Sequence, residues 1–215
     1  MAFWPQHMSN VRPQATSYPL AAMPNEHDRV TAVALPPESG IAGAYESVNL
    51  ADAYAIRLPA GALRSPELLA RFIFSQQAPW ISGLMRVRDA LVAGFGLKTA
   101  KHLMPLGSEA RERRVGLFKI YSTSATEIVL GEDDKHLDFR VSVLCSVDAA
   151  ASKPRLVVST VVHCHNRLGR VYILIIAPFH RLVVQSSLRR AARIGWPQAS
   201  RHEPKSTSHA VPPEV

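Results

Sequence analysis

Cysteine is scarce in this sequence, and neither cysteine lies in a spacing that metal or redox chemistry uses. Only two occur in 215 residues, Cys145 and Cys164. Two cysteines cannot form the disulfide framework of a small secreted domain, and neither belongs to a CxxC pair of the kind that binds zinc or exchanges disulfides. We therefore interpret both as small apolar residues of the interior.

Long hydrophobic runs are also missing. The longest, residues 171–179, has nine residues, includes Pro178 and is followed by His180 and Arg181. A membrane-spanning helix needs about 20 apolar residues, so no transmembrane segment is expected. The first residues lack the basic opening and the continuous apolar stretch of a secretory signal, which favours a cytoplasmic location.

The short motifs on which large enzyme classes depend are absent. GxSxG, Walker A, GxGxxG and HExxH do not occur, and no cofactor is expected. The net charge of +8 is dispersed, apart from Arg189, Arg190 and Arg193 near the end of an expected helix, where cations complement the helix dipole. Because no nucleic-acid-binding signature accompanies this cluster, no nucleic acid partner is expected.

Composition divides the chain into three parts. Residues 1–40 are rich in Pro, Ser, Asn and Ala without a sustained period, and residues 196–215 have the same character. Such segments are typical of disordered or loosely attached arms. Residues 41–195 carry the periodic patterns and are long enough for one sizeable core. We expect a single domain with two tails.

A strand and two helices are predicted in the first half of that domain. Residues 53–58 alternate weakly and end at a Pro-Ala-Gly turn. Ser65-Pro66-Glu67 supplies an N-cap, a proline at the first helical position and an acidic first turn, which predicts a helix to about Phe74. A second helix begins near Pro79, and Arg88 lies on its apolar stripe.

A period of two then predicts four strands. They cover residues 115–121, 127–130, 137–145 and 156–165. The connections between them are too short for parallel crossovers, so the strands are expected to pair antiparallel.

From Leu168 the period returns to about 3.6, which predicts a long C-terminal helix that bends at Pro178. Its expected inward face comprises Leu168, Tyr172, Ile175, Ile176, Phe179, Leu182, Val183 and Ser186. A long, bent and broadly apolar helix needs a concave surface to pack against. The predicted fold is therefore α+β, a twisted antiparallel sheet wrapped around the C-terminal helix.

Three strings in the C-terminal half resemble a known family. GEDDKHLDFR from Gly131 to Arg140, HNRLGRVY from His165 to Tyr172 and PFHRLVV from Pro178 to Val184 are similar to the DUF2867 proteins, a mostly bacterial family of unknown function. That family is similar in pattern to the helix-grip (SRPBCC) superfamily of Bet v 1, START and polyketide-cyclase-like proteins. The resemblance implies an apolar cavity between sheet and helix, although one fold hosts many functions.

Polar residues in the first of these strings are candidates for a site. His136, Asp138 and Arg140 alternate with apolar residues on one predicted strand and share a face. Toward a cavity, they could orient a ligand or act as acid–base groups. Toward solvent, they form a charged exterior, which the regular alternation favours.

Two histidines on the last predicted strand raise the question of a metal. His163 and His165 share a face in an HxH spacing, and His136 or Asp138 would have to be the third ligand. Paired histidines on a strand are more often an exposed face, so no metal is expected. For His180, near the proline bend, a structural hydrogen bond is the favoured role.

Arginines supply the remaining candidates. Arg88 on an apolar stripe needs an acidic partner, such as Asp134 or Asp138, or a ligand carboxylate, and the structural ion pair is the favoured reading. Backbone N–H groups at the start of the C-terminal helix, beside Arg170, would hold an anion. Tyr172 in the same string completes the set of ligand-binding candidates.

The leading hypothesis for function is non-catalytic binding of a small apolar or amphipathic ligand in a cavity between sheet and C-terminal helix. Its candidate contacts are Arg88, Asp138, Arg140, Arg170 and Tyr172. One alternative is a cyclase or hydratase type of enzyme that uses His136, Asp138 or His165 in that cavity. The other is an interaction protein that forms a homodimer through its C-terminal helix.

Overall fold

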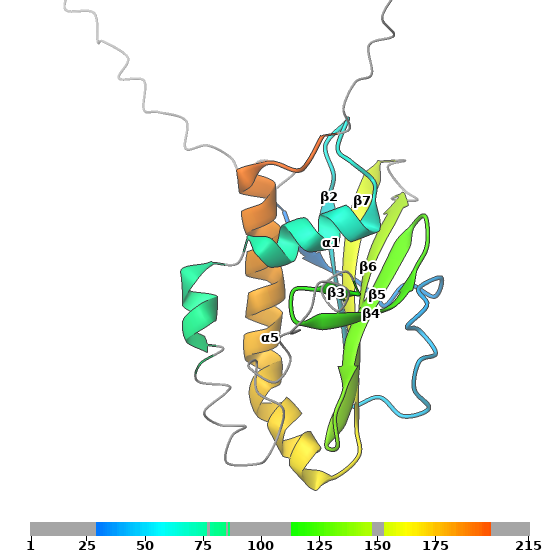
Figure 1. The fold of residues 1–215 in the computed structure, drawn as a ribbon, viewed down its shortest axis with the longest axis vertical. Helices are drawn as coiled ribbons and strands as arrows, with labels where there is room; N and C mark the ends of the chain where they lie inside the picture. The colour runs from blue at the N-terminus through cyan, green and yellow to red at the C-terminus, as the bar shows by residue number, and fades with distance from the viewer. Residues whose placement is uncertain (1–28, 77, 85, 87–112, 148–152, 199–215) are drawn as a thin grey trace, which may run out of the picture.

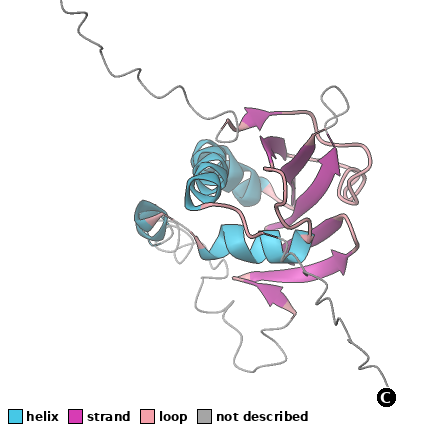
Figure 2. Ribbon diagram, turned by 90° about the horizontal axis from the view of Figure 1, so that it is seen from above, coloured by secondary structure: helices cyan, strands magenta, loops and turns pink. Residues whose placement is uncertain are grey.

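An antiparallel sheet with helices on one face organises the described part of the chain (Figures 1 and 2). This computed structural model describes residues 29–76, 78–84, 86, 113–147 and 153–198. The named elements are β1 (Thr31–Ala32), β2 (Leu50–Arg57), α1 (Pro66–Ser75), β3 (Arg114–Val115), β4 (Phe118–Thr123), β5 (Glu127–Asp133), β6 (Leu137–Val147), β7 (Pro154–Cys164) and α5 (Arg167–Ile194). The strands follow the order β1-β2-β7-β6-β5-β4-β3, and every neighbouring pair is antiparallel. The predicted α+β class is confirmed.

Local sequence signals set the start of α1. The Ser65 side chain accepts a hydrogen bond from the N–H of Leu68, and Pro66 occupies the first turn. Glu67 forms an ion pair with Arg71 one turn later, at 2.8 Å. These features satisfy the free N–H groups and the dipole at the helix start, so the predicted N-terminus is confirmed.

The face of the sheet that carries α1 and α5 forms the main core. Val141 and Val143 of β6 pack there with buried side chains of β2, β5 and β7 and with Leu188 and Ala191 of α5. Since side chains alternate along a strand, the intervening residues of β6 point to the opposite face. Ile41, from the segment between β1 and β2, packs on Val129 and Val161 of that opposite face. Both faces of the central strands are therefore covered, which explains why β7 is buried continuously from Leu156 to Val162.

Helix α5 runs for 28 residues through Pro178. Asn166 caps it, with its side chain accepting a hydrogen bond from the N–H of Gly169. Gly169 itself lies against the backbone of His136, where a Cβ atom would collide with the carbonyl oxygen. The first turns of α5, yellow in Figure 1, slant toward the lower end of the sheet, while its later turns run beside β2 and α1.

The packed face of α5 differs from the prediction. Ile175, Phe179 and Leu182 of the predicted inward face are 52%, 43% and 58% exposed, whereas Leu188 and Ala191 are fully buried. Apolar residues occupy more than half of the circumference of this helix between 168 and 184. Periodicity alone therefore could not identify which arc meets the sheet, and the predicted arc is rotated away from it.

The folded unit extends past both predicted limits, 41 and 195. Strand β1 pairs with β2, and Trp196 is only 4% exposed, packed near Phe72 with ring centroids 6.1 Å apart. The backbone N–H of Leu63 also donates to the carbonyl of Pro197. Proline-rich composition suggested linkers here, but a few apolar anchors bind these segments to the core.

Of the cysteines, Cys164 is buried and Cys145 half-buried, and neither is in a disulfide.

Candidate functional site

Three of the predicted site residues, Asp138, Arg140 and His165, lie on the sheet face opposite α5, in a group that we call the outer-face cluster. Its members are Tyr45, Ser47, Tyr121, Asp133, Asp138, Arg140, His163 and His165. Asp138 and Arg140 point away from α5 because they alternate with Leu137, Phe139 and Val141, which pack into the cores on the helix side.

Arg140 is the centre of this cluster. Its guanidinium lies 3.7 Å from the ring centre of Tyr121 and 5.6 Å from that of Tyr45, and it donates to Asp133 at 2.7 Å. The hydroxyl of Tyr121 donates to the other oxygen of Asp133 at 2.7 Å. Burial alone would raise the pKa of Asp133, but hydrogen bonds from Arg140 and Tyr121 hold it below its usual value. The Arg140 charge is thus fully engaged by protein groups.

The histidines of the cluster also have protein partners. His165 Nε2 lies 3.1 Å from Asp138 Oδ2. The ring of His163 stacks on Tyr45 with centroids 5.6 Å apart, and its Nδ1 lies 3.0 Å from the hydroxyl of Ser47. Tyr45 and Ser47 belong to the segment between β1 and β2, so these contacts bind that segment to the sheet.

Glu127 also holds the segment between β1 and β2 against the sheet, nearer to β1. Its carboxylate accepts hydrogen bonds from the Ser39 hydroxyl at 2.6 Å and from the Gly40 N–H at 2.9 Å. It also accepts one from the hydroxyl of Ser142 on β6. The polar residues of the outer face therefore act chiefly as a clamp on residues 39–47.

A different group of polar side chains lies between β2 and α5, and we call it the interhelix–sheet cluster: Asp52, His180 and Arg181. Asp52 Oδ1 is 3.4 Å from His180 Nε2, and Asp52 Oδ2 is 3.8 Å from Arg181 Nε. The side chains of Asp52 and His180 are only 10% and 23% exposed. Both oxygens of Asp52 and the Nε2 of His180 are buried without a hydrogen-bond partner. Buried polar atoms of this kind usually form hydrogen bonds, so these are exceptional.

Apolar side chains surround the cluster on the N-terminal side of α5. Tyr172, Ile173 and Ala177 pack there against a buried group formed by Leu50, Leu137, Val162 and Cys164. On the other side, Tyr54 is hydrogen-bonded to Gln185, and burial followed by the charge of Asp52 raises the pKa of Tyr54. A carboxylate thus lies at the edge of an apolar cluster between the sheet and α5.

Comparison with protein-family models identifies the family of this chain. The model of a family described as a protein of unknown function, DUF2867, matches residues 44–187. The chain belongs to the DUF2867 family. The matched span includes every residue of the interhelix–sheet cluster and of the outer-face cluster. No curated protein and no solved structure gives a significant match to the chain.

The other predicted residues of this DUF2867 protein are dispersed. His136 precedes β6 and lies 2.9 Å from the side-chain nitrogen of Asn166 at the start of α5, so it does not join Asp138 and His165. Arg170 is exposed, and Tyr172 packs toward the sheet. Arg88 lies outside the described residues. Within the described ranges, no three His, Cys, Asp or Glu side chains come together in a way that could hold a metal ion.

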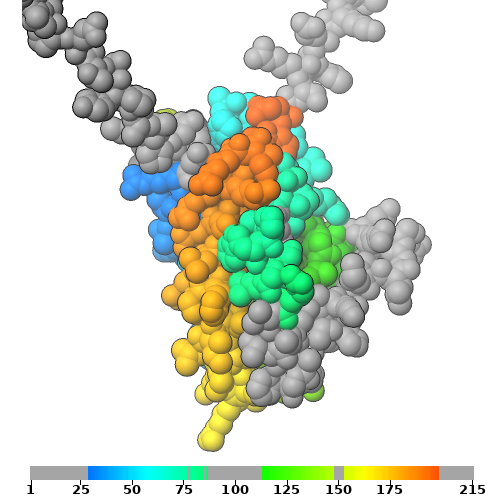
Figure 3. All heavy atoms as spheres, turned by 90° about the vertical axis from the view of Figure 1, so that its left-hand side faces the viewer, coloured from blue at the N-terminus to red at the C-terminus, as the bar shows by residue number. Residues whose placement is uncertain are grey.

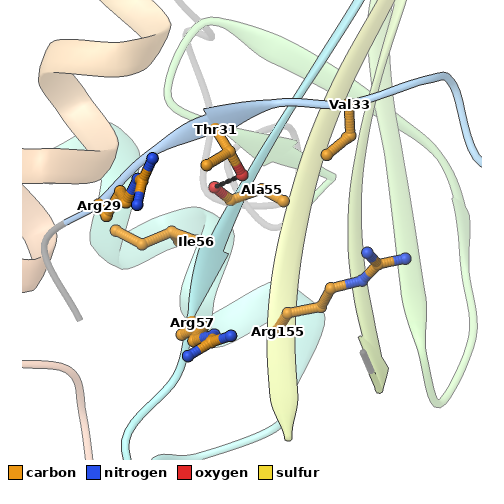
Figure 4. A pocket seen from close by; sticks show the side chains of 7 residues that line it. All are labelled: Arg29, Thr31, Val33, Ala55, Ile56, Arg57 and Arg155. Carbon is orange, nitrogen blue, oxygen red and sulfur yellow. Dashed lines mark hydrogen bonds between the residues drawn. The ribbon is translucent and has the colours of Figure 1, made fainter. Parts of the chain in front are cut away.

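An open pocket of about 280 Å³ lies at the β1–β2–β7 corner of the DUF2867 fold. Arg29, Arg57 and Arg155 line it, and Arg57 lies directly across from Arg155 in the strand register. Figure 4 shows their guanidinium groups well apart and pointing in different directions, and Arg155 donates to Ser146 at 2.9 Å. Without convergence of the three charges, this pocket is a weaker candidate than the interhelix–sheet cluster.

Sequence reasoning missed Asp52 and weighed His180 only as a partner for the backbone. A signal for Asp52 does exist in the sequence. On β2, Leu50, Tyr54 and Ile56 face the helix side, and alternation places Asp52 among them. An acidic residue in the middle of an apolar strand face is a candidate site because its charge needs a partner or a ligand.

Proposed function

We propose that this DUF2867 protein binds a small amphipathic molecule between the sheet and α5, with the interhelix–sheet cluster as the polar anchor. The observation that carries the proposal is the Asp52 carboxylate, which is nine-tenths buried although neither of its oxygens accepts a hydrogen bond. The basic partners, His180 and Arg181, lie at 3.4 and 3.8 Å, beyond good hydrogen-bond distances.

The energetics favour a functional explanation for this cluster. Burial of a charged pair costs several kcal/mol per ion, and only good geometry with additional hydrogen bonds recovers that cost. Here the additional hydrogen bonds are missing. A ligand with a hydroxyl, amine or amide group would supply the donors that Asp52 lacks.

The chemistry of the surroundings indicates the rest of the ligand. Leu50, Val162, Tyr172 and Ala177 pack together next to the cluster and would form the apolar lining for a ligand that enters between β2 and α5. An apolar body would be stabilised there by about 25 cal/mol for each Å² that leaves water. The proposed ligand class is therefore a donor-bearing head on a hydrocarbon body.

The acid–base alternative receives less support from the geometry. An enzyme of the cyclase or hydratase type would need His136, Asp138 and His165 at one cavity. Asp138 and His165 pair on the outer face, while His136 interacts with Asn166 at the start of α5. We therefore favour binding without catalysis.

The test uses three probes that share a twelve-carbon chain: dodecylamine, 1-dodecanol and dodecane. Isothermal titration and thermal unfolding of the full chain would measure their binding. We expect the amine and the alcohol to bind more tightly than dodecane, and Asp52→Val to weaken their binding at least about tenfold while dodecane binding is unchanged. Asp138→Asn, on the outer face, is the matched control and should leave all three affinities unchanged.

Two results would contradict the proposal. One is the absence of binding for every probe, together with no small molecule in native mass spectra of protein purified from its host. The other is equal loss of affinity in Asp52→Val and Asp138→Asn, which would indicate a general effect on the fold.

A further inference from the structure

Helix α5 has an apolar stripe on the side that faces away from the sheet. The outer stripe consists of Val171, Leu174, Ile175, Phe179 and Leu182, which are 55%, 77%, 52%, 43% and 58% exposed. Their spacing of three and four residues places them on one face of the helix. Figure 3 shows α5, yellow to orange, running along the surface on this side of the molecule.

Such a stripe is unusual on a helix that already packs with its other face. Few residues of α5 are buried, and most of them are small: Gly169, Ser187, Leu188 and Ala191. Ile173 packs toward the sheet, but the five large apolar side chains of the outer stripe point outward. Contiguous exposed apolar surface of this kind marks a site of interaction with another molecule or a membrane.

The charge of α5 narrows the choice of partner. The helix contains six arginines and no Asp or Glu among its 28 residues. Arg189 and Arg193 continue the line of Leu182 at steps of seven and four residues, and Arg167 stands one turn before Val171. The outer stripe is therefore bordered by positive charge at both ends.

A second copy of the chain fits this pattern poorly. Two α5 helices packed antiparallel through their outer stripes would bring Arg167 and Arg170 of one copy near Arg189 and Arg193 of the other. A parallel arrangement would place identical arginines together. Neither offers an acidic residue on α5 to relieve the repulsion.

We propose that the outer stripe docks α5 lengthwise on an anionic membrane surface. The acyl boundary would take up the five apolar side chains, and the lipid phosphates and acidic headgroups would pair with the flanking arginines. This proposal is independent of the ligand site between β2 and α5, since it uses the opposite side of the helix.

The geometry favours a helix that lies on the membrane over one that crosses it. By length and composition alone, Arg167–Ile194 could span a bilayer. However, Leu188 and Ala191 are fully buried in the main core and Gly169 touches the backbone of His136. Crossing would strip α5 from the sheet and expose that core, whereas surface docking leaves it in place.

Vesicle flotation with the full chain tests the proposal. The vesicles are phosphatidylcholine alone, or phosphatidylcholine with about 30% phosphatidylserine. We expect flotation with the anionic vesicles, weakening as salt rises because the charges are screened. Leu174→Ser/Leu182→Ser should reduce the partition coefficient at least about tenfold, since burial of one leucine is worth about that factor.

Matched variants separate the stripe from general effects. Leu68→Ser removes an exposed leucine of α1, 51% exposed, and should leave flotation unchanged. Arg189→Gln/Arg193→Gln should lose binding to anionic vesicles, whereas Arg113→Gln/Lys153→Gln, with the same change of net charge, should lose much less. Circular dichroism checks that each variant keeps its helix content.

Three outcomes would overturn the proposal. The first is no flotation of the wild-type chain with anionic vesicles at low salt. The second is equal loss in the stripe variant and in Leu68→Ser. The third is a dimer in light scattering that Leu174→Ser/Leu182→Ser dissociates, which would assign the stripe to a second copy.

Discussion

Asp52 Oδ1 and His180 Nε2 face each other across the β2–α5 interface at 3.4 Å, and both atoms are buried without a hydrogen bond. The pair connects the second strand of the sheet to the turn of α5 that follows Pro178. Its two members are opposite in charge when His180 is protonated, yet the geometry is too loose for a strong interaction. Such a pair contributes little to stability and leaves the hydrogen-bonding capacity of both atoms unused.

This relationship predicts that an apolar replacement stabilises the protein. Asp52→Val/His180→Leu should raise the free energy of unfolding by about 1–4 kcal/mol, because replacement of buried ion pairs by apolar residues is often stabilising. His180→Leu alone should instead destabilise by up to about 3 kcal/mol, since it leaves the carboxylate buried with only Arg181 nearby. Urea denaturation of the wild type, the single variants and the double variant measures both effects. A double variant less stable than His180→Leu would contradict this account.

The junction between β7 and α5 should be intolerant of any side chain at residue 169. Gly169→Ala would drive a Cβ atom into the carbonyl oxygen of His136, and we expect a loss of about 1–3 kcal/mol despite the better helix propensity of alanine. Gly43→Ala is the matched control, because a Cβ there meets nothing within 4 Å. Thermal unfolding that shifts equally in the two variants would argue against this close contact.

Alkaline pH should loosen the outer-face cluster through Tyr45. Burial raises the pKa of Tyr45 to about 12, and Arg140 opposes this shift only in part. A raised pKa means that the folded state holds the phenolic proton more tightly than the unfolded chain. Its contribution to stability is therefore present below about pH 10 and is lost as pH rises toward 12.

Tyr45→Phe removes that titration and a hydroxyl without a hydrogen-bond partner. We expect similar or greater stability at pH 8 and a shallower loss of stability between pH 10 and 12. Urea midpoints at several pH values measure the slope. Some slope should remain, because the pKa values of Tyr54 and Tyr121 are also raised, chiefly by burial. An identical slope in the variant would show that Tyr45 is not responsible.

The clamp on residues 39–47 should depend on Glu127. Glu127→Ala removes the acceptor for Ser39, Gly40 and Ser142, and we expect a loss of about 2–3 kcal/mol. Amide hydrogen exchange should accelerate in the segment between β1 and β2 while α1 stays protected. Glu38→Ala, at an exposed position of the same segment, should leave both quantities nearly unchanged.

The parts of the fold that local chemistry decides were predictable from the sequence. The Ser65-Pro66 start of α1 and the alternation of β6 depend on residues close together in the chain. Arg140 and Asp138 share a face as predicted. His136 does not join them, because β6 begins at Leu137 and the preceding turn directs His136 toward Asn166.

The candidate site depended on information that periodicity does not contain. Asp52 and His180 come from opposite ends of the domain, and only the β2–β7 pairing and the position of α5 bring them together. Hydropathy also could not show which arc of α5 faces the sheet. Ile173 and Ile175 have the same hydropathy, yet Ile173 packs inward and Ile175 is exposed. Tertiary packing, not composition, makes that choice.

Both edges of the sheet end in strands of two residues, β1 and β3. A neighbouring chain that approached either edge would find only two residues of paired backbone to extend, too short a template for strand addition. Self-association through cross-β growth is thereby discouraged at the sheet. If α5 docks on a membrane as proposed, its exposed apolar side chains are carried by a protein whose sheet edges do not promote aggregation before it reaches that surface.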